Sequence, residues 1–186
     1  MARDEPDSEL AWETTATGTD YTCPGFDVRR DEVVLPDGTE TDFHYVDEPA
    51  AVVVLPFDVD GAVVVIDEWR QAVGRVNRGL PAGTVEPEDD DLAAAARREL
   101  AEETGYAAET VEPLCTAEPA NGVTNTVHHY FVARGCRPGG AQDLDFNESI
   151  RTTTADYDDL LSSALAGRIR DGRVLLALLR YECERE

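Results

Sequence analysis

Glu99, Glu102 and Glu103 lie three and four residues apart in the sequence, directly after Arg98. If this segment is helical, those spacings bring the three carboxylates together, where like charges repel by roughly 0.2–0.5 kcal/mol per pair. Arg98 can orient one carboxylate, yet a single guanidinium does not neutralise three glutamates. The residue types and their spacing therefore predict a further cation beside them.

The candidate cation is a hard divalent metal ion. Oxygen-only ligands favour Mg²⁺, Mn²⁺ or Ca²⁺ over zinc, and a Mg²⁺ site with few protein carboxylates completes its shell with water and substrate phosphate. The alternative is a solvated acidic helix face, which a strongly acidic protein can also carry. Spacing alone leaves both interpretations open.

A helix from Leu92 to Thr104 has to position these side chains. Asp89-Asp90-Asp91 offers an N-cap and negative charge at the start, and no Pro or Gly interrupts the segment. Gly105 is a natural residue just past the end. A separate stripe of the helix is apolar and mostly small, so it can pack closely on a sheet; it consists of Ala93, Ala96 and Leu100.

The composition is strongly acidic. The 186 residues have a formal net charge of −23, from 39 Asp plus Glu against 16 basic residues, which argues against nucleic acid or an anionic membrane as a partner. All 16 basic residues are Arg. This composition resembles that of proteins from salt-accumulating halophiles, because a Debye length near 3 Å at ~1 M salt makes the self-repulsion tolerable.

The cysteines and the N-terminus bear on the cellular compartment. The four cysteines are scattered, without C-x-x-C or a His at zinc spacing, so reduced thiols are expected instead of disulfides or a zinc site. The N-terminus has no apolar signal region, and no apolar run approaches membrane length. We therefore expect a cytoplasmic protein with no membrane partner.

The rest of the chain alternates strands with helices. Two strand-like runs flank the turn Pro36-Asp37-Gly38 and predict an N-terminal hairpin, and two continuous apolar runs predict central, buried strands. The predicted strands are 26–35, 39–46, 51–57, 62–67, 111–116, 127–134 and 149–154, and helices follow at 155–166 and after Asp171. We expect a partly ordered N-terminal segment at 1–25 and a single domain at 26–186 with a mixed sheet between helices.

The segment from Arg98 to Tyr106, RELAEETGY, resembles the second half of the Nudix hydrolase signature G-x5-E-x7-R-E-U-x-E-E-x-G-U, in which U is apolar. The first half departs from the signature. Counting forward from Gly83, the expected Glu falls on Asp89; counting back from Glu99, it falls on Asp90, so the loop carries one extra residue. The resemblance implies an α/β fold, a Nudix-type α/β/α sandwich with a mixed β-sheet, and a metal-dependent hydrolase of nucleotide-type small molecules.

Segments outside the signature resemble the ADP-ribose pyrophosphatase branch of this family. They are VLPDG at 34–38, EWR at 68–70, LPAG at 80–83 and GRIRD at 167–171. Glu68 and Gly79 depart from the branch, which commonly has Gln and Glu at these positions. The branch implies ADP-ribose as the substrate, AMP and ribose 5-phosphate as the products, and a homodimer.

The resemblance also implies roles for individual residues. It makes Glu99 and Glu103 ligands of Mg²⁺, or alternatively of Mn²⁺, with Glu102 assisting. The backbone carbonyl of Ala82 completes the protein's share of the ligands. Arg98 belongs with Glu102 to the expected catalytic set.

The resemblance also implies a base that activates water in the loop before residue 150. Glu148 is the first candidate and Asp145 the second, and a solvated loop acid is the alternative interpretation of Glu148. Arg70 is the candidate for holding a substrate phosphate. Trp69 is the candidate for stacking on the nucleobase of the substrate, with ordinary core packing as the alternative.

Three other functions are compatible with the sequence. Another Nudix substrate, such as a nucleotide sugar, a dinucleotide or an oxidised nucleoside triphosphate, keeps the chemistry and changes the pocket. A non-catalytic nucleotide-binding module with a Nudix fold would be expected to lose motif acids, and this chain keeps all three. A purely structural acidic protein would show no dependence on divalent metals.

Overall fold

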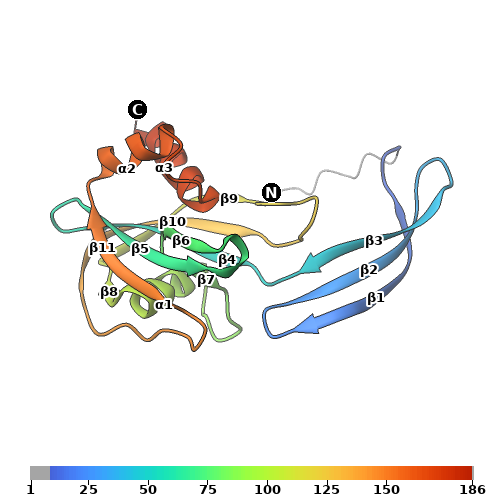
Figure 1. Ribbon diagram of the computed structural model, residues 1–186, viewed down its shortest axis with the longest axis horizontal. Helices are drawn as coiled ribbons and strands as arrows, with labels where there is room; N and C mark the ends of the chain where they lie inside the picture. Colours follow the sequence, from blue (N-terminus) through green and yellow to red (C-terminus); the bar gives the residue numbers. More distant parts are fainter. Residues whose placement is uncertain (1–8, 186) are drawn as a thin grey trace. The chain divides into compact units, whose positions relative to one another are not determined.

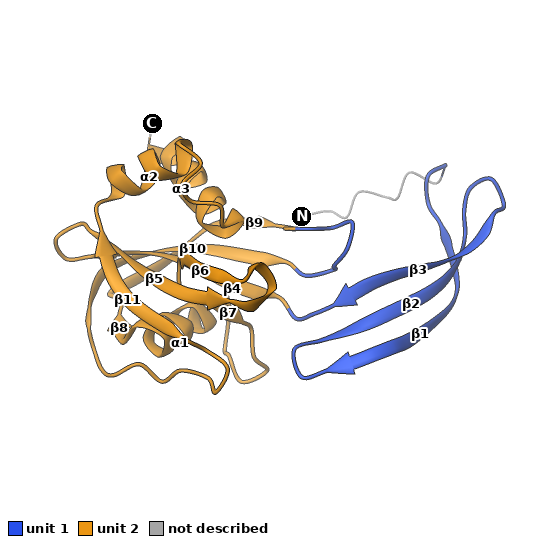
Figure 2. Ribbon diagram, in the orientation of Figure 1, with its two compact units in different colours: residues 1–49, 120–126 blue, residues 50–119, 127–186 orange. Residues whose placement is uncertain are grey.

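The computed structural model describes residues 9–185 (Figure 1). The chain forms two compact units (Figure 2). The first extends to Pro49 and includes Ala120–Thr126, and the second consists of Ala50–Pro119 and the residues from Val127 onward. Every candidate site residue identified in the sequence belongs to the second unit.

The first unit contains a three-stranded antiparallel sheet in the order β1-β2-β3. Its strands are β1 (Glu13–Cys23), β2 (Phe26–Val34) and β3 (Glu40–Asp47). The predicted hairpin between β2 and β3 is confirmed: Gly38 takes φ 84°, and its amide donates to the Leu35 carbonyl at 2.9 Å.

Strand β1 was not predicted, because its polar, threonine-rich sequence lacks the apolar alternation that marks a half-buried strand. Pairing with β2 stabilises it, from Glu13↔Val34 to Cys23↔Phe26. The expected boundary after residue 25 therefore falls between two paired strands of one sheet. Residues 1–8 of the expected N-terminal segment lie outside the described residues, and the single domain at 26–186 stays a prediction.

In the part of the chain that the structure describes, the second unit contains a mixed eight-stranded sheet. Strand β10 pairs in parallel with β4 and antiparallel with β9. The order is β11-β5-β4-β10-β8, with β6 beside β5, β7 beside β4 and β9 beside β10. The strands are β4 (Ala51–Asp58), β5 (Val63–Arg70), β6 (Arg75–Gly79), β7 (Ala82–Thr84), β8 (Tyr106–Ala107), β9 (Thr110–Ala117), β10 (His128–Pro138) and β11 (Ile150–Ala155).

Helices cover both faces of this sheet (Figure 1). Helix α1 (Leu92–Thr104) packs on one face, and α2 (Tyr157–Leu165) and α3 (Gly172–Arg185) pack on the other. A short 3₁₀ helix, η1 (Gln71–Val73), joins β5 to β6. This mixed sheet between two layers of helices confirms the predicted α/β/α fold class.

Strand β4 carries both halves of the hydrophobic core. Val53 and Leu55 pack in the cluster that includes α2 and α3, whereas Val52 and Val54 pack in the cluster that includes α1. All four side chains are fully buried, which confirms the prediction made from the continuous apolar run. Helix α1 therefore rests on a strand that is fixed from both sides.

No helix within residues 9–185 is long and apolar enough to span a membrane. The four cysteines, all in the described range, are free thiols, as predicted.

Candidate active site

Helix α1 begins and ends where its sequence predicts. The Asp91 carboxylate accepts a hydrogen bond from the Ala94 amide at 2.8 Å and caps the first turn. At the other end Gly105 is left-handed, with φ 73°, and its amide donates to the Ala101 carbonyl at 2.8 Å. Leu100 is fully buried in the cluster shared with β4 and β10, so the apolar stripe holds the helix close to the sheet.

Glu99 and Glu103 are buried charged side chains. Only 7% of Glu99 and 3% of Glu103 is exposed. Glu103 Oε2 accepts a hydrogen bond from the Ala82 amide of β7 at 2.9 Å. The Glu99 carboxylate lies so close to Gly83 that a Cβ at this glycine would come within 2.2–2.3 Å of its atoms. This burial excludes a solvated acidic face for these two glutamates.

Arg98 joins the helix acids to β7. Its Nη1 atom donates to Glu99 Oε1 at 2.8 Å and to Glu102 Oε2 at 2.9 Å. Its Nη2 atom donates to the Thr84 carbonyl at 2.8 Å. One guanidinium therefore orients two of the three helix carboxylates, and its own position is fixed by the backbone of the neighbouring strand.

Asp89 is the loop aspartate that pairs with Arg98. Arg98 Nη2 donates to Asp89 Oδ2 at 2.9 Å, and Nε donates to Oδ1 at 3.1 Å. Counting forward from Gly83 therefore finds the acid that pairs with the motif arginine. The extra residue of the loop lies after Asp89, on the way to α1.

The loop between β10 and β11 is anchored on the C-terminal end of α1. The Asp143 amide donates to the Glu102 carbonyl at 2.9 Å, and the Gln142 side-chain amide donates to the Glu103 carbonyl. Farther along, Glu148 Oε2 accepts a hydrogen bond from the Asp145 amide at 3.0 Å, and the Glu148 amide donates to the Asp145 carbonyl at 3.0 Å. The two candidate bases therefore belong to one closed turn.

The helix, β7 and this loop line one cavity of about 260 Å³. Seven of its lining side chains are carboxylates, and Arg98 is the single basic one among the described residues. The carboxylates are Glu86, Glu99, Glu102, Glu103, Asp143, Asp145 and Glu148. The structure thus brings together the three helix acids and both candidate bases.

Burial and neighbouring carboxylates raise the pKa values of two acids in this cavity. Burial raises the pKa of Glu99 to about 7, although the hydrogen bond from Arg98 opposes the rise. Burial raises the pKa of Glu103 to about 8, and the hydrogen bond from Ala82 opposes it only in part. The charge of Glu148 adds to the rise at both glutamates. A positive charge in the cavity would favour the ionised form of both acids.

The donor set of the cavity suits a hard divalent cation. Its candidate side-chain ligands are carboxylates, the ligand type that Mg²⁺ and Mn²⁺ prefer. Within residues 9–185, no three His, Cys, Asp or Glu side chains already converge as a ready ligand set. Because Arg98 holds one oxygen of Glu99 and one of Glu102, these acids would bind a metal ion through their other oxygens or after turning. Ala82 directs its amide to Glu103, and the expected role of its carbonyl stays a prediction.

Arg70 and Trp69 do not line this cavity. Arg70 Nη2 lies 2.6 Å from Glu68 Oε2, and Glu68 is buried. Trp69 is 47% exposed, and its indole Nε1 donates to Gln71 Oε1 at 2.9 Å. Core packing is therefore the wrong interpretation of Trp69. The substrate-binding roles expected for both residues stay predictions.

Some lining residues were missed by the sequence analysis. Glu86 and Asp143 each stand in an acid-rich stretch, Glu86 before the Asp89–Asp91 run and Asp143 in the loop after β10. Leu144 is an apolar residue in that same loop. No spacing rule distinguishes such acids from their solvated neighbours, so only the fold identifies them.

Comparisons with known proteins agree with this fold. A family model described as NUDIX domain matches residues 47–178. The methanol dehydrogenase activator of Bacillus methanolicus is 30% identical over 149 residues, which cover 80% of each protein. The ADP-ribose pyrophosphatase of Mycobacterium tuberculosis is 29% identical over 145 residues, which cover 78% of this chain and 70% of that protein. The crystal structure of an ADP compounds hydrolase has a similar fold, with a TM-score of 0.81 and 19% identity over 93% of each chain.

Proposed function

This chain belongs to the Nudix family and is a Nudix pyrophosphohydrolase, and from that premise we propose that it cleaves a nucleoside diphosphate linked to another moiety. ADP-ribose is the first substrate to test, with AMP and ribose 5-phosphate as the products. The relative named ADP-ribose pyrophosphatase supports this choice. A nucleotide sugar, a dinucleotide or an oxidised nucleoside triphosphate is the competing substrate.

The observation that carries the proposal is the cavity of seven carboxylates around one guanidinium. Glu99 and Glu103 are the proposed ligands of Mg²⁺, with Glu102 assisting, and a bound metal ion would withdraw charge from the phosphoryl oxygens and activate water. Arg98 keeps the carboxylates of Glu99 and Glu102 oriented through its two hydrogen bonds. Burial of Glu99 and Glu103 limits competing water around them.

Glu148 is the proposed base, in preference to Asp145. Its side chain is half-buried, whereas Asp145 is exposed. The charge of Glu148 raises the pKa of Glu99 and of Glu103, which means that its carboxylate lies near the proposed metal ligands. A carboxylate in that position can accept the proton of the attacking water.

Arg70 and Trp69 are proposed to hold the rest of the substrate. Burial and the neighbouring Arg173 lower the pKa of the Arg70 guanidinium, and the planar donors of this group suit a substrate phosphate. The exposed ring of Trp69 offers a face on which the nucleobase of the substrate can stack. A homodimer, a cytoplasmic location and a high-salt habitat complete the proposal, and they rest on the resemblance and the composition described above.

The test is a panel of pyrophosphate substrates assayed with Mg²⁺ and Mn²⁺ at low and high salt. ADP-ribose is expected to give the highest kcat/KM, and Glu103→Gln to lower kcat by roughly 100-fold or more because a metal ligand loses its charge. Glu88→Gln is the matched control, since Glu88 is an exposed acid outside the cavity. Turnover of Glu103→Gln within a few-fold of the parent would refute the metal assignment.

A parallel pair of variants tests the base. Glu148→Gln is expected to lower kcat by about 10²–10⁴-fold, and Asp145→Asn by only a few-fold. The opposite ranking would transfer the role to Asp145. Failure to cleave any pyrophosphate substrate would refute the proposed substrate class.

A further inference from the structure

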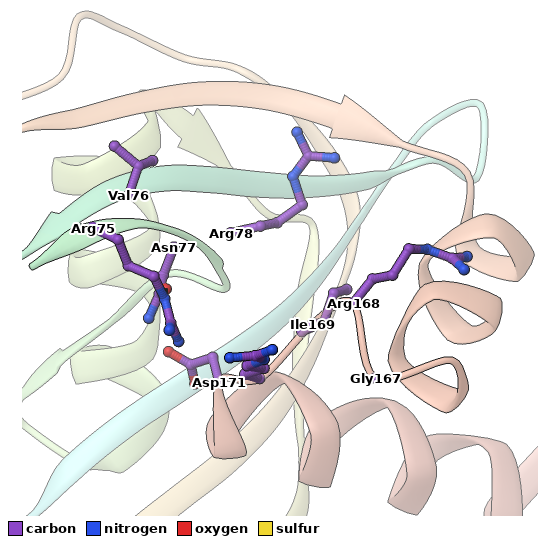
Figure 3. Close-up of a pocket in the computed structure, with 9 residues that line it drawn as sticks. Arg75, Val76, Asn77, Arg78, Gly167, Arg168, Ile169 and Asp171 are labelled. Carbon is purple, nitrogen blue, oxygen red and sulfur yellow. The ribbon is translucent and has the colours of Figure 1, made fainter. Parts of the chain in front are cut away.

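A second cavity, of about 480 Å³, lies in the same unit between β6 and the connection from α2 to α3 (Figure 3). It shares no lining residue with the acidic cavity. Its lining is rich in arginine and consists of Arg75, Val76, Asn77, Arg78, Gly167, Arg168, Ile169, Arg170 and Asp171. The lining carries four arginines and one acid, so this region is positively charged in a chain whose net charge is −23.

Two of these five charges, those of Arg78 and Asp171, are already compensated by ion pairs. Arg78 Nε lies 3.1 Å from Asp67 Oδ1, and Asp67 also pairs with Arg151 at 2.8 Å. The single acid of the lining, Asp171, pairs with Arg173, which lies outside the lining, at 3.2 Å.

The other three arginines have no such compensation. Among the described residues, no ion pair joins Arg75, Arg168 or Arg170 to a carboxylate, although the chain carries 39 acids. Arg168 donates to Ser163 Oγ at 3.2 Å and extends away from Asp171 (Figure 3), so the guanidinium charges of Arg75 and Arg170 are the ones left for an external anion.

The backbone that carries these arginines is held in place. Ile169 is buried between Arg168 and Arg170, and the Arg168 amide donates to the Ser163 carbonyl at 2.9 Å. On β6, Arg75 Nε donates to Asn77 Oδ1 at 2.7 Å. Arg75 and Asn77 point toward the segment that carries Asp171, whereas Arg78 and Arg168 extend away from it (Figure 3).

We propose that this cavity binds a phosphate dianion, either as inorganic phosphate or as a phosphomonoester, at a site separate from the acidic cavity. Arg75 and Arg170 hold the phosphate oxygens. A guanidinium presents several N–H donors in a fixed plane, which matches the tetrahedral oxygens of phosphate better than a monatomic anion. Because long-range attraction is absent in so acidic a chain, a local group of unpaired arginines is what such an anion requires.

The proposal is tested by calorimetric titration of the full chain with inorganic phosphate in a metal-chelating buffer. Without divalent metal the acidic cavity repels anions, and the part of the binding that is lost when Arg75 and Arg170 are both replaced by Ala reports the arginine cavity. We expect saturable 1:1 binding that persists when chloride replaces part of the buffer salt at equal ionic strength. The Arg75→Ala/Arg170→Ala variant is expected to bind about tenfold more weakly or worse. Arg137→Ala, which removes an exposed arginine outside the cavity, is expected to bind as the parent does.

A second titration, with AMP, identifies the source of the phosphate. The affinities are compared for the binding that the Arg75→Ala/Arg170→Ala variant loses: tighter binding of inorganic phosphate supports a free-ion site, and tighter binding of AMP supports a site for a nucleotide monoester. Three results would overturn the proposal: no saturable binding, an equal loss in Arg137→Ala, or binding that requires Mg²⁺ and therefore belongs to the acidic cavity. None of these results bears on the proposed pyrophosphatase activity.

Discussion

Asp89 and Arg98 form an ion pair through two hydrogen bonds, at 2.9 and 3.1 Å, that connects the loop after β7 to the second turn of α1. The Asp89 side chain is only 6% exposed, and Arg98 is 23% exposed. Arg98 also holds Glu99 and Glu102, so the pair controls the orientation of the acids as well as the path of the loop.

Replacing Asp89 by Ala is expected to lower the free energy of unfolding by about 1–3 kcal/mol, since a charge-assisted pair is lost. The turnover number should fall as well, because Arg98 loses one of its anchors. Urea denaturation and steady-state kinetics measure the two effects. Asp90→Ala, an exposed neighbour, is the control and should change stability by no more than about 0.5 kcal/mol. Equal costs for the two variants would contradict the assignment of Asp89.

Replacing Gly83 by Ala is expected to displace the Glu99 carboxylate, whose atoms lie 2.2–2.3 Å from the position of the new Cβ. Shifting a catalytic group by about 1 Å can cost roughly 100-fold in rate, so kcat should fall by that order. The affinity for Mn²⁺, measured by calorimetry, should fall with it. Gly25→Ala is the control, because a Cβ there meets nothing within 4 Å. Unchanged Mn²⁺ affinity in Gly83→Ala would separate Glu99 from the metal site.

The stability of the metal-free protein should fall as pH rises from 6 to 8. The pKa of Glu103 is raised by burial from its ordinary value of 4.5 to about 8, so in this range the folded protein keeps a proton that the unfolded chain has released. Two pH units correspond to about 2–3 kcal/mol for one such group. Denaturation in a chelating buffer measures the slope.

Glu103→Gln is the matched variant for this measurement, because an amide does not titrate. Its stability should change less between pH 6 and 8 than that of the parent. Added Mg²⁺ should stabilise the parent more at pH 8 than at pH 6, since metal ligands must be ionised. Identical pH slopes for the parent and Glu103→Gln would contradict the raised pKa.

Replacing Gln142 by Ala is expected to loosen the loop that carries Glu148. Gln142 donates from its side chain to the Glu103 carbonyl and, at 3.2 Å, to Thr152 Oγ1. The turnover number should fall by roughly 3- to 10-fold, while the free energy of unfolding changes by only about 1 kcal/mol. Asn147→Ala, an exposed residue of the same loop, is the control. A loss of stability without a loss of kcat would make Gln142 a structural residue only.

The sequence predicts α1 and the central strands because their determinants are local. Asp91 caps the helix and Gly105 ends it, and both functions depend on residues within one turn. The apolar run of β4 is equally informative, because a strand buried on both faces needs no polar positions. The three helix acids were predicted for the same reason, since their i, i+3 and i+4 spacing is visible in the chain.

Features that depend on distant contacts could not be predicted. Strand β1 exists through its pairing with β2, and its own residues carry no strand pattern. The choice between Asp89 and Asp90 was decided by which of them meets Arg98. Asp143 lines the cavity because its amide binds the Glu102 carbonyl, a contact across 41 residues of sequence that no local rule anticipates.

The main-chain carbonyls of Glu102 and Glu103 anchor the loop from β10 to β11, while their side chains point to different partners: Glu102 to Arg98, and Glu103 to the Ala82 amide. Glutamine at either position removes the negative charge but leaves the backbone anchor intact. Isosteric replacements here are therefore electrostatic probes, and a rate that they lose in the presence of metal ion can be attributed to the carboxylate charge instead of to a displaced loop.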